Sequence, residues 1–247
     1  MIGCSKNISK NMSKVCLINQ PVGLGDIFFL QKFVDIKIQE GFRVIFPVAD
    51  NLIFVKDYIS KPNLEFYTLN ESFDYKQYMG SSEIIKEPEF EYYPIRFADQ
   101  HLPGSCMEVK YSLVGHDFNG WQNHFVWERN LEKENILYYD FLGLKDDEDY
   151  VVVSNTWGTP PHTASKPVPY NKTYKVVKVE ITNNFTPFDW AKVFENAKEI
   201  SIVDTSFNYI LEKLKLKADK MFLTSRFTPP NFYHIINLFK QNWIYLQ

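Results

Sequence analysis

The order of apolar and polar residues in the first fifty positions predicts a strand, a helix and a second strand. Residues 15–19 (VCLIN) form an apolar run with the length of a buried strand. Residues 20–26 (QPVGLGD) have the glycine and proline content of a turn. Apolar side chains then recur every three or four positions over residues 27–40, which predicts a helix that ends at Gly41. With another strand at residues 43–48, this unit is typical of a parallel sheet.

The same alternation of strands and helices continues along the chain. We expect further strands at residues 64–69, 82–85, 150–154, 174–181, 200–203 and 221–223. We expect further helices at residues 51–59, 127–142, 187–197, 207–216 and 231–243. Thr186 and Pro187 suit the N-cap and the first turn of the helix that they precede.

Two α/β patterns follow one another, and an acidic stretch separates them. Residues 145–149 (KDDED) lie between a predicted helix end and a predicted strand, as an interdomain linker does. We therefore predict an α/β fold of two small Rossmann-like domains facing each other across a cleft. Residues 1–13 are expected to form a flexible tail, residues 14–146 the N-terminal domain and residues 147–247 the C-terminal domain.

Composition narrows the class of protein. Aromatic residues make up 17% of the 247 residues, which is enough to build a dense core rather than a disordered chain. The net charge of −3 lacks the basic excess of a nucleic-acid-binding protein. The three scattered cysteines predict neither a disulfide framework nor a thiolate zinc site. No apolar stretch is long enough for a membrane span and residues 1–14 lack the apolar core of a secretory signal, so we expect a cytoplasmic protein.

The first place where chemistry is expected is the turn after the first strand, which contains Gly23, Gly25 and Asp26. Glycines let the backbone approach a ligand, and a helix start offers N–H groups to an anion. The dinucleotide-binding fingerprint requires a third glycine where this chain has Phe28, although Asp50 keeps that alternative open. Asp26 is placed to act as a general base for a hydroxyl, or simply to stabilise the helix start.

The second place is Asp204-Thr205-Ser206, again between a predicted strand and a predicted helix. Its two hydroxyls and the helix-start N–H groups suit a phosphate or diphosphate without a metal. The alternative is an ordinary N-capping sequence.

Together the two turns resemble those of heptosyltransferase-like glycosyltransferases. Gly23-Leu24-Gly25-Asp26 is similar to the Gly-x-Gly-Asp turn of that family, and Asp204-Thr205-Ser206 to its Asp-Thr-Gly-x-x-His pattern. The resemblance implies the GT-B architecture, a nucleotide-diphosphate-sugar donor, a glycan or other hydroxyl acceptor, and no metal or cofactor. It also implies that Asp26 is the base, that Asp204, Thr205 and Ser206 hold the donor diphosphate, and that the last helix packs back on the N-terminal domain.

Two positions depart from the family pattern. The family usually has Thr-Pro where this chain has Leu30-Gln31, and its histidine falls at Tyr209. The chain is also short for the architecture. The motifs are four to six residues long, so they indicate the fold more strongly than the activity.

Two loops supply further candidate ligand contacts. Interleaved aromatic and polar residues at 101–129 suit the wall of a sugar site or the packing beneath a loop, and those expected to contact a sugar or acceptor are His116, Asp117 and Trp121. Arg129 is expected to contact the diphosphate or the acceptor, or to lie on the surface. Lys166 and His162, in a proline-rich loop after a buried strand, are placed to reach a phosphate, and His162 is also a candidate sugar or acceptor contact.

The pattern favours a glycosyltransferase, with two alternatives. One is a nucleotide-sugar epimerase-like enzyme with the same donor site, and the other is a non-catalytic sugar-binding or scaffold protein of the same fold. The chain has no phosphate-binding P-loop motif, no zinc-protease motif and no hydrolase nucleophile elbow. The oligomeric state is not predicted.

Overall fold

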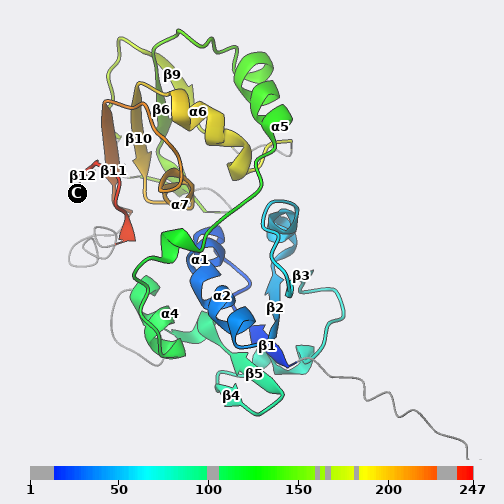
Figure 1. Cartoon of the computed structure of the whole chain (residues 1–247). Helices are drawn as coiled ribbons and strands as arrows, with labels where there is room; N and C mark the ends of the chain where they lie inside the picture. The colour runs from blue at the N-terminus through cyan, green and yellow to red at the C-terminus, as the bar shows by residue number, and fades with distance from the viewer. Residues whose placement is uncertain are drawn as a thin grey trace, which may run out of the picture.

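The computed structural model describes residues 14–98, 106–158, 162–164, 168–180, 184–226 and 238–246 (Figure 1). These residues form two five-stranded sheets and one two-stranded ribbon. We call residues 14–124, with the first sheet, the first half, and residues 131–246, with the second sheet, the second half. Residues 125–130 form the crossover segment between them.

The first sheet has the strand order β3-β2-β1-β5-β4. All neighbouring strands are parallel except β4, which is antiparallel to β5. The strands are β1 (Val15–Ile18), β2 (Arg43–Val48), β3 (Leu64–Thr68), β4 (Ile85–Lys86) and β5 (Phe90–Tyr93). The α-helices of this half are α1 (Leu24–Phe29), α2 (Gln31–Gln39) and α4 (Cys106–Val114), and its 3-10 helices span Asp50–Asp57, Lys76–Gly80, Ile95–Phe97 and Trp121–Asn123.

The second sheet is parallel throughout and has the order β12-β11-β10-β6-β9. Its strands are β6 (Tyr150–Ser154), β9 (Lys175–Lys178), β10 (Glu199–Val203), β11 (Lys220–Thr224) and β12 (Trp243–Leu246). Its helices within the described residues are α5 (Leu131–Asn135), a π-helix (Ile136–Phe141), a 3-10 helix (Pro187–Trp190), α6 (Ala191–Asn196) and α7 (Phe207–Leu211). Strands β7 (Thr156–Trp157) and β8 (His162–Thr163) form the ribbon.

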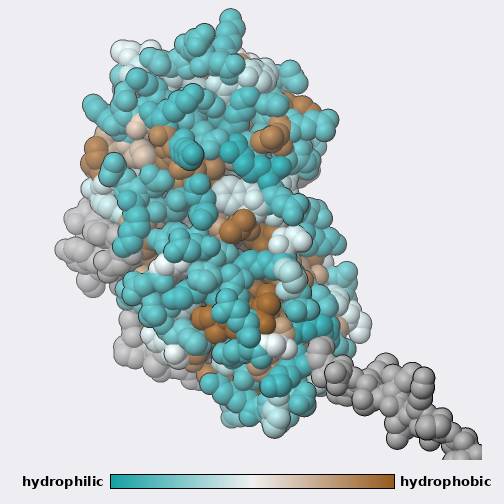
Figure 2. All heavy atoms as spheres, in the orientation of Figure 1, coloured by the Kyte–Doolittle hydropathy of each residue, from teal (hydrophilic) through white to brown (hydrophobic). Residues whose placement is uncertain are grey.

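Burial on both faces explains why the central strands are continuously apolar. In β1, Cys16 and Ile18 belong to the main core, whereas Val15 and Leu17 face a smaller core on the other side of the sheet. Strand β6 behaves in the same way, since alternate valines face the main core and a small cluster around Val168. Outside the core, the face in Figure 2 is mainly hydrophilic, with separate apolar patches.

Aromatic side chains join the two halves into one core. Phe188 of the second half stacks on Tyr58 with ring centroids 4.5 Å apart, and its ring also lies near Phe28, Phe54 and Trp127. Beside this cluster, the Tyr58 hydroxyl donates to Oδ1 of the buried Asp189 at 2.7 Å. The aromatic excess of the sequence is therefore concentrated partly where the halves meet.

The prediction of an α/β fold with parallel sheets is confirmed, and so is the start of the helix at Thr186 and Pro187. Thr186 and Asp189 form a reciprocal capping box at that point. The structure differs at the end of the chain, where residues 239–242 are not helical and Trp243 begins β12 instead of ending a helix. The parallel pairing of β12 with β11 outweighs the local pattern there. The predicted tail, 1–13, and residues 231–237 of the predicted last helix lie outside the described residues.

The helix predicted at residues 127–142 begins only at Leu131, because the Asn130 side chain caps it by accepting from the Lys133 amide. The domain prediction assigns this helix to the N-terminal domain, but it packs against α6 in the second half. Arg129 and Asn135 bond side chains of α6, namely Glu195 and Lys192. By packing, the change of sheet therefore lies in the crossover segment, before the acidic stretch at 145–149.

Candidate functional site

The strand orders place one topological switch point in each sheet. Strand β1 lies between β2 and β5, and β6 lies next to β10, so chain connections leave in opposite directions from these strands. Open parallel sheets bind ligands beyond the carboxyl ends of strands at such points. The turn with Asp26 follows β1, and the turn with Asp204 follows β10. Both predicted sites thus begin at the carboxyl end of a strand at or beside a switch point.

The Asp26 carboxylate lies over the glycine that starts its turn. Asp26 is in the first turn of α1, and the preceding Gly23 has φ 87°, which favours glycine. A Cβ on Gly23 would lie 1.9 Å from Asp26 Oδ2. Gly23 therefore permits both the backbone turn and the position of this carboxylate.

A buried lysine from the 101–129 stretch, which is not among the contacts expected there, faces Asp26. The ammonium of Lys110, on α4, lies 3.0 Å from Asp26 Oδ1 and donates a hydrogen bond to Gln20 Oε1 at 2.9 Å. Oδ1 is buried and its contact with Lys110 is an ion pair without hydrogen-bond alignment. The Asp26 side chain is 19% exposed, so its exposed surface belongs to atoms other than Oδ1. One carboxylate oxygen is thereby held inward.

Gly25 faces a protein side chain. A Cβ on Gly25 would lie 2.8 Å from Cε2 of Tyr209, the residue at the position of the family's histidine. Tyr209 is buried on α7, and its ring lies near those of Phe29, Trp121 and Phe239. Gly25 thus allows α7 to approach α1, and Tyr209 is an interface residue.

The Asp204-Thr205-Ser206 turn is partly occupied by its own hydrogen bonds. The Thr205 amide donates a hydrogen bond to Asn208 Oδ1 at 2.8 Å. The Phe207 amide donates a longer one to Thr205 Oγ1 at 3.4 Å. Asp204 is buried, and its Oδ2 lies 3.7 Å from Arg226 Nε. Among the described residues, no hydrogen bond is found to the Ser206 hydroxyl.

Arg129 is committed to two carboxylates. Its Nε donates to Oε1 of the buried Glu134 at 2.8 Å, a second nitrogen bonds the other oxygen of Glu134, and Nη1 lies 2.8 Å from Glu195 Oε2. The hydrogen bonds to Glu134 raise the pKa of Arg129 above its ordinary value, against the opposing effect of burial. This arrangement gives Arg129 a structural task, and the predicted diphosphate contact has no support from it.

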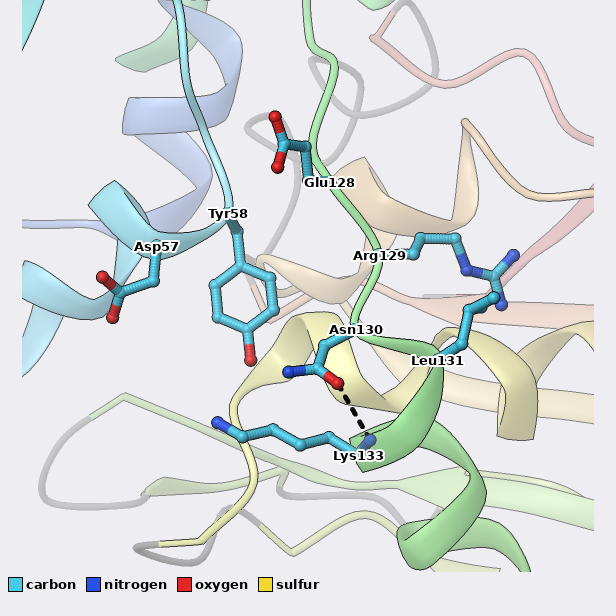
Figure 3. A pocket seen from close by; sticks show the side chains of 7 residues that line it. All are labelled: Asp57, Tyr58, Glu128, Arg129, Asn130, Leu131 and Lys133. Carbon is cyan, nitrogen blue, oxygen red and sulfur yellow. Dashed lines mark hydrogen bonds between the residues drawn. The ribbon is translucent and has the colours of Figure 1, made fainter.

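An open pocket of about 460 Å³ lies at the crossover segment (Figure 3). It is lined by Asp57, Tyr58, Glu128, Arg129, Asn130, Leu131 and Lys133. Arg129 is the only one of the predicted ligand contacts in this lining, and its side chain extends away from Tyr58. The pocket therefore does not coincide with the turn of Asp26.

The predicted sugar contacts near residue 120 have different surroundings. Trp121 is buried, and its Nε1 donates to the Leu238 carbonyl at 3.1 Å, so it has no ring face for a sugar. Asp117 is exposed, and hydrogen bonds from Lys32 and from the Asn119 amide lower its pKa. His116 is half-buried, with its ring 5.9 Å from the Phe33 ring.

His162 is exposed on the β7–β8 ribbon and its ring stacks on Trp157 at 5.9 Å. Lys166 lies outside the described residues. Within the part of the chain that the structure describes, no group of three or more His, Cys, Asp or Glu side chains is placed to hold a metal ion. In the same part, no helix has the length and apolar character that crossing a membrane requires.

Comparison with known protein families gives no match, and comparison with curated proteins gives none either. Among solved structures, the chain is similar to the glycosyl transferase family 9 protein from Veillonella parvula DSM 2008. The TM-score is 0.56 and the identity 12%, covering 94% of this chain and 86% of that one. It is also similar to the iron-containing dodecameric glycosyltransferase TibC from enterotoxigenic E. coli H10407, with a TM-score of 0.50 and 11% identity. That match covers 95% of this chain but 63% of TibC, so the chain spans less than two thirds of TibC.

At these identities the likeness establishes the fold. The α/β arrangement of parallel sheets is shared with glycosyltransferases, and the resemblance drawn from the two short turns is confirmed at that level.

Proposed function

We propose that this protein transfers a sugar from a nucleotide-diphosphate-sugar donor to a hydroxyl acceptor, and that Asp26 is the general base. Three features support the proposal: the fold shared with glycosyltransferases, the two turns at switch points, and the Asp26 carboxylate. The position of Asp26 carries it, because this carboxylate is partly exposed at the carboxyl end of β1.

The chemistry follows from that position. An acceptor hydroxyl bound beside Asp26 would give its proton to the carboxylate while its oxygen attacks the anomeric carbon of the donor. Because Oδ1 is buried against Lys110, the proton acceptor in this proposal is Oδ2. The bond from the sugar to the diphosphate breaks as the new glycosidic bond forms.

The donor diphosphate is assigned to the turn of Thr205 and Ser206. Hydroxyl and N–H donors there would stabilise the negative charge that grows on the leaving diphosphate, without a metal. The Ser206 hydroxyl, which has no hydrogen bond within the described residues, is the group best placed to donate. Binding of a diphosphate at Thr205 requires its amide to leave Asn208.

The test is Asp26→Asn, assayed with a panel of nucleotide sugars for release of nucleoside diphosphate. We expect turnover to fall by roughly 10²–10⁴-fold, the usual contribution of a general base. Donor affinity, measured by calorimetry, is expected to stay within about twofold, since the diphosphate lies on the other turn. Wild-type turnover in the Asp26→Asn variant would remove Asp26 as the base.

Asp219→Asn is a matched control. Asp219 pairs with Lys198 at 2.9 Å and precedes β11, so it lies at the amino-terminal edge of the second sheet. Its loss is expected to leave turnover unchanged.

A non-catalytic sugar-binding protein is the second candidate function. It is favoured by the engagement of the Thr205 amide with Asn208 and by the burial of Tyr209 where the family has a histidine. Binding of a nucleotide sugar with no release of nucleoside diphosphate, over the whole panel, would establish this function against the first.

A further inference from the structure

The ion pair between Lys110 of α4 and Asp26 of α1 fixes the orientation of the Asp26 carboxylate. We propose that Lys110 is a positioning residue for Asp26, which holds the carboxylate in the one orientation that leaves Oδ2 available to a hydroxyl. This inference rests on the proposed role of Asp26.

Lys110 is fixed by its surroundings. Its side chain is 6% exposed, and its ammonium meets two partners, Asp26 Oδ1 at 3.0 Å and Gln20 Oε1 at 2.9 Å. A buried ammonium is costly unless it is paired and hydrogen-bonded, so moving away from these oxygens is unfavourable. The next residue, Tyr111, anchors α4, since its hydroxyl donates to the Phe29 carbonyl at 2.7 Å.

Gln20 links the Lys110 ammonium to the backbone of the turn that precedes Gly23. While Oε1 of Gln20 accepts from Lys110, its Nε2 donates to the Val22 carbonyl at 2.7 Å. Gln20 is buried, and it lies just after β1. Lys110 therefore contacts the Asp26 carboxylate directly and is linked through Gln20 to the backbone at Val22, just before Gly23.

The carboxylate has little freedom left. Oδ1 is buried against Lys110, and Oδ2 lies over the Cα of Gly23, where a Cβ would be 1.9 Å away. Among the described residues, Lys110 is the charged side chain found in contact with Asp26. Gln20 shares the Lys110 ammonium, and the Tyr209 ring lies beside Gly25. Without the ammonium, Oδ1 would be a buried, uncompensated anion, and we expect the carboxyl to take up a proton more readily.

The experiment compares Lys110→Met, Lys110→Arg and Lys37→Met in the full chain. Lys37 is a matched control, because it is also buried and pairs with carboxylates, those of Glu40 and Glu91, on another part of the fold. Thermal unfolding of each variant reports folding, and donor turnover is measured from pH 5 to pH 9.

We expect Lys110→Met to lower kcat by at least about tenfold with donor KM nearly unchanged, and to move the acidic limb of the pH profile upward by about one unit. Lys110→Arg, which keeps the charge, is expected to recover part of kcat and to return the acidic limb. Lys37→Met is expected to lose stability but to keep the wild-type pH profile. Unchanged kcat in Lys110→Met, or an equal loss and shift in Lys37→Met, overturns the positioning role.

A second readout separates this inference from the proposed function. The ¹³C carboxyl resonance of Asp26, identified by its loss in Asp26→Asn, is titrated in the wild type and in Lys110→Met. An upward move of its titration midpoint in Lys110→Met supports the coupling even if no donor is turned over, in which case the proposed function alone fails. An unmoved midpoint overturns the inference, whatever the activity.

Discussion

Gly25 of α1 and Tyr209 of α7 lie so close together that a Cβ on Gly25 would be 2.8 Å from Cε2 of the tyrosine ring. Real Cβ atoms do not approach neighbours this closely, so the glycine is required by the contact between the halves. The Tyr209 ring is held in turn at 5.1 Å from both Trp121 and Phe239. Gly25, which the sequence presents as part of a ligand-binding turn, and Tyr209, which departs from the family pattern, thus form one packing contact.

Gly25→Ala is expected to lower the free energy of unfolding by about 1–3 kcal/mol, because an added methyl group overpacks the α1–α7 contact. Gly80→Ala is the control, since a Cβ at Gly80 has no neighbour within 4 Å. Denaturant titration measures both. In a Tyr209→Ala background the cost of Gly25→Ala should shrink by more than about 0.5 kcal/mol, and additive effects would show that the two residues are not coupled.

Phe188→Ala tests the aromatic junction. Its ring is buried against Tyr58, Phe28 and Trp127, so the substitution is expected to cost roughly 3–5 kcal/mol of stability. Phe141→Ala removes a ring that is 56% exposed and should cost much less. Denaturation followed by tryptophan fluorescence measures the difference, and an equal cost for both variants would contradict the junction.

Arg129→Met separates structure from ligand binding at the crossover segment. Because it leaves the buried Glu134 without its partner, we expect a loss of about 1–3 kcal/mol in unfolding free energy. The double variant Arg129→Met/Glu134→Gln should recover part of that loss, since the uncompensated charge is gone. Nucleoside-diphosphate affinity is expected to stay unchanged, and a large fall in affinity would restore Arg129 as a donor contact.

The central strands and the two turns are predictable because their signals are local. Residues 15–18 and 150–154 are apolar almost throughout, and burial on both faces of a parallel sheet produces that pattern. Strand β5 gives no such signal, because its sequence, FEYY, is short and contains a charged residue. Its neighbour β4, which pairs with it antiparallel, has only two residues. The final strand, β12, follows a stretch whose sequence has helical spacing. Its position depends on parallel pairing with β11, a contact that the local sequence does not indicate.

The candidate site is predictable only in part. Asp26 and its glycines stand out from the turn itself, but Lys110 is distant in the sequence and comes from a helix outside the predicted set. A signal is present, since Met107, Tyr111 and Val114 recur at helical spacing and Lys110 lies on the same buried face. Arg129 and Trp121 have residue types suited to ligands, and only the fold reveals the partners Glu134 and Leu238 that occupy them.

Glu212 provides a pH-dependent test of the second half. Burial raises the pKa of this carboxyl above its ordinary value, although the Lys240 and Gln241 amides and Trp243 Nε1 donate hydrogen bonds to it. An acid with a raised folded-state pKa takes up its proton in the folded protein first, so stability rises as the pH falls through that pKa. The free energy of unfolding of the wild type, relative to Glu212→Gln, should therefore increase between pH 7 and pH 5. Denaturant titrations at the two pH values measure this difference, and a relative stability that is constant or falls with acidification would contradict the burial of this charge.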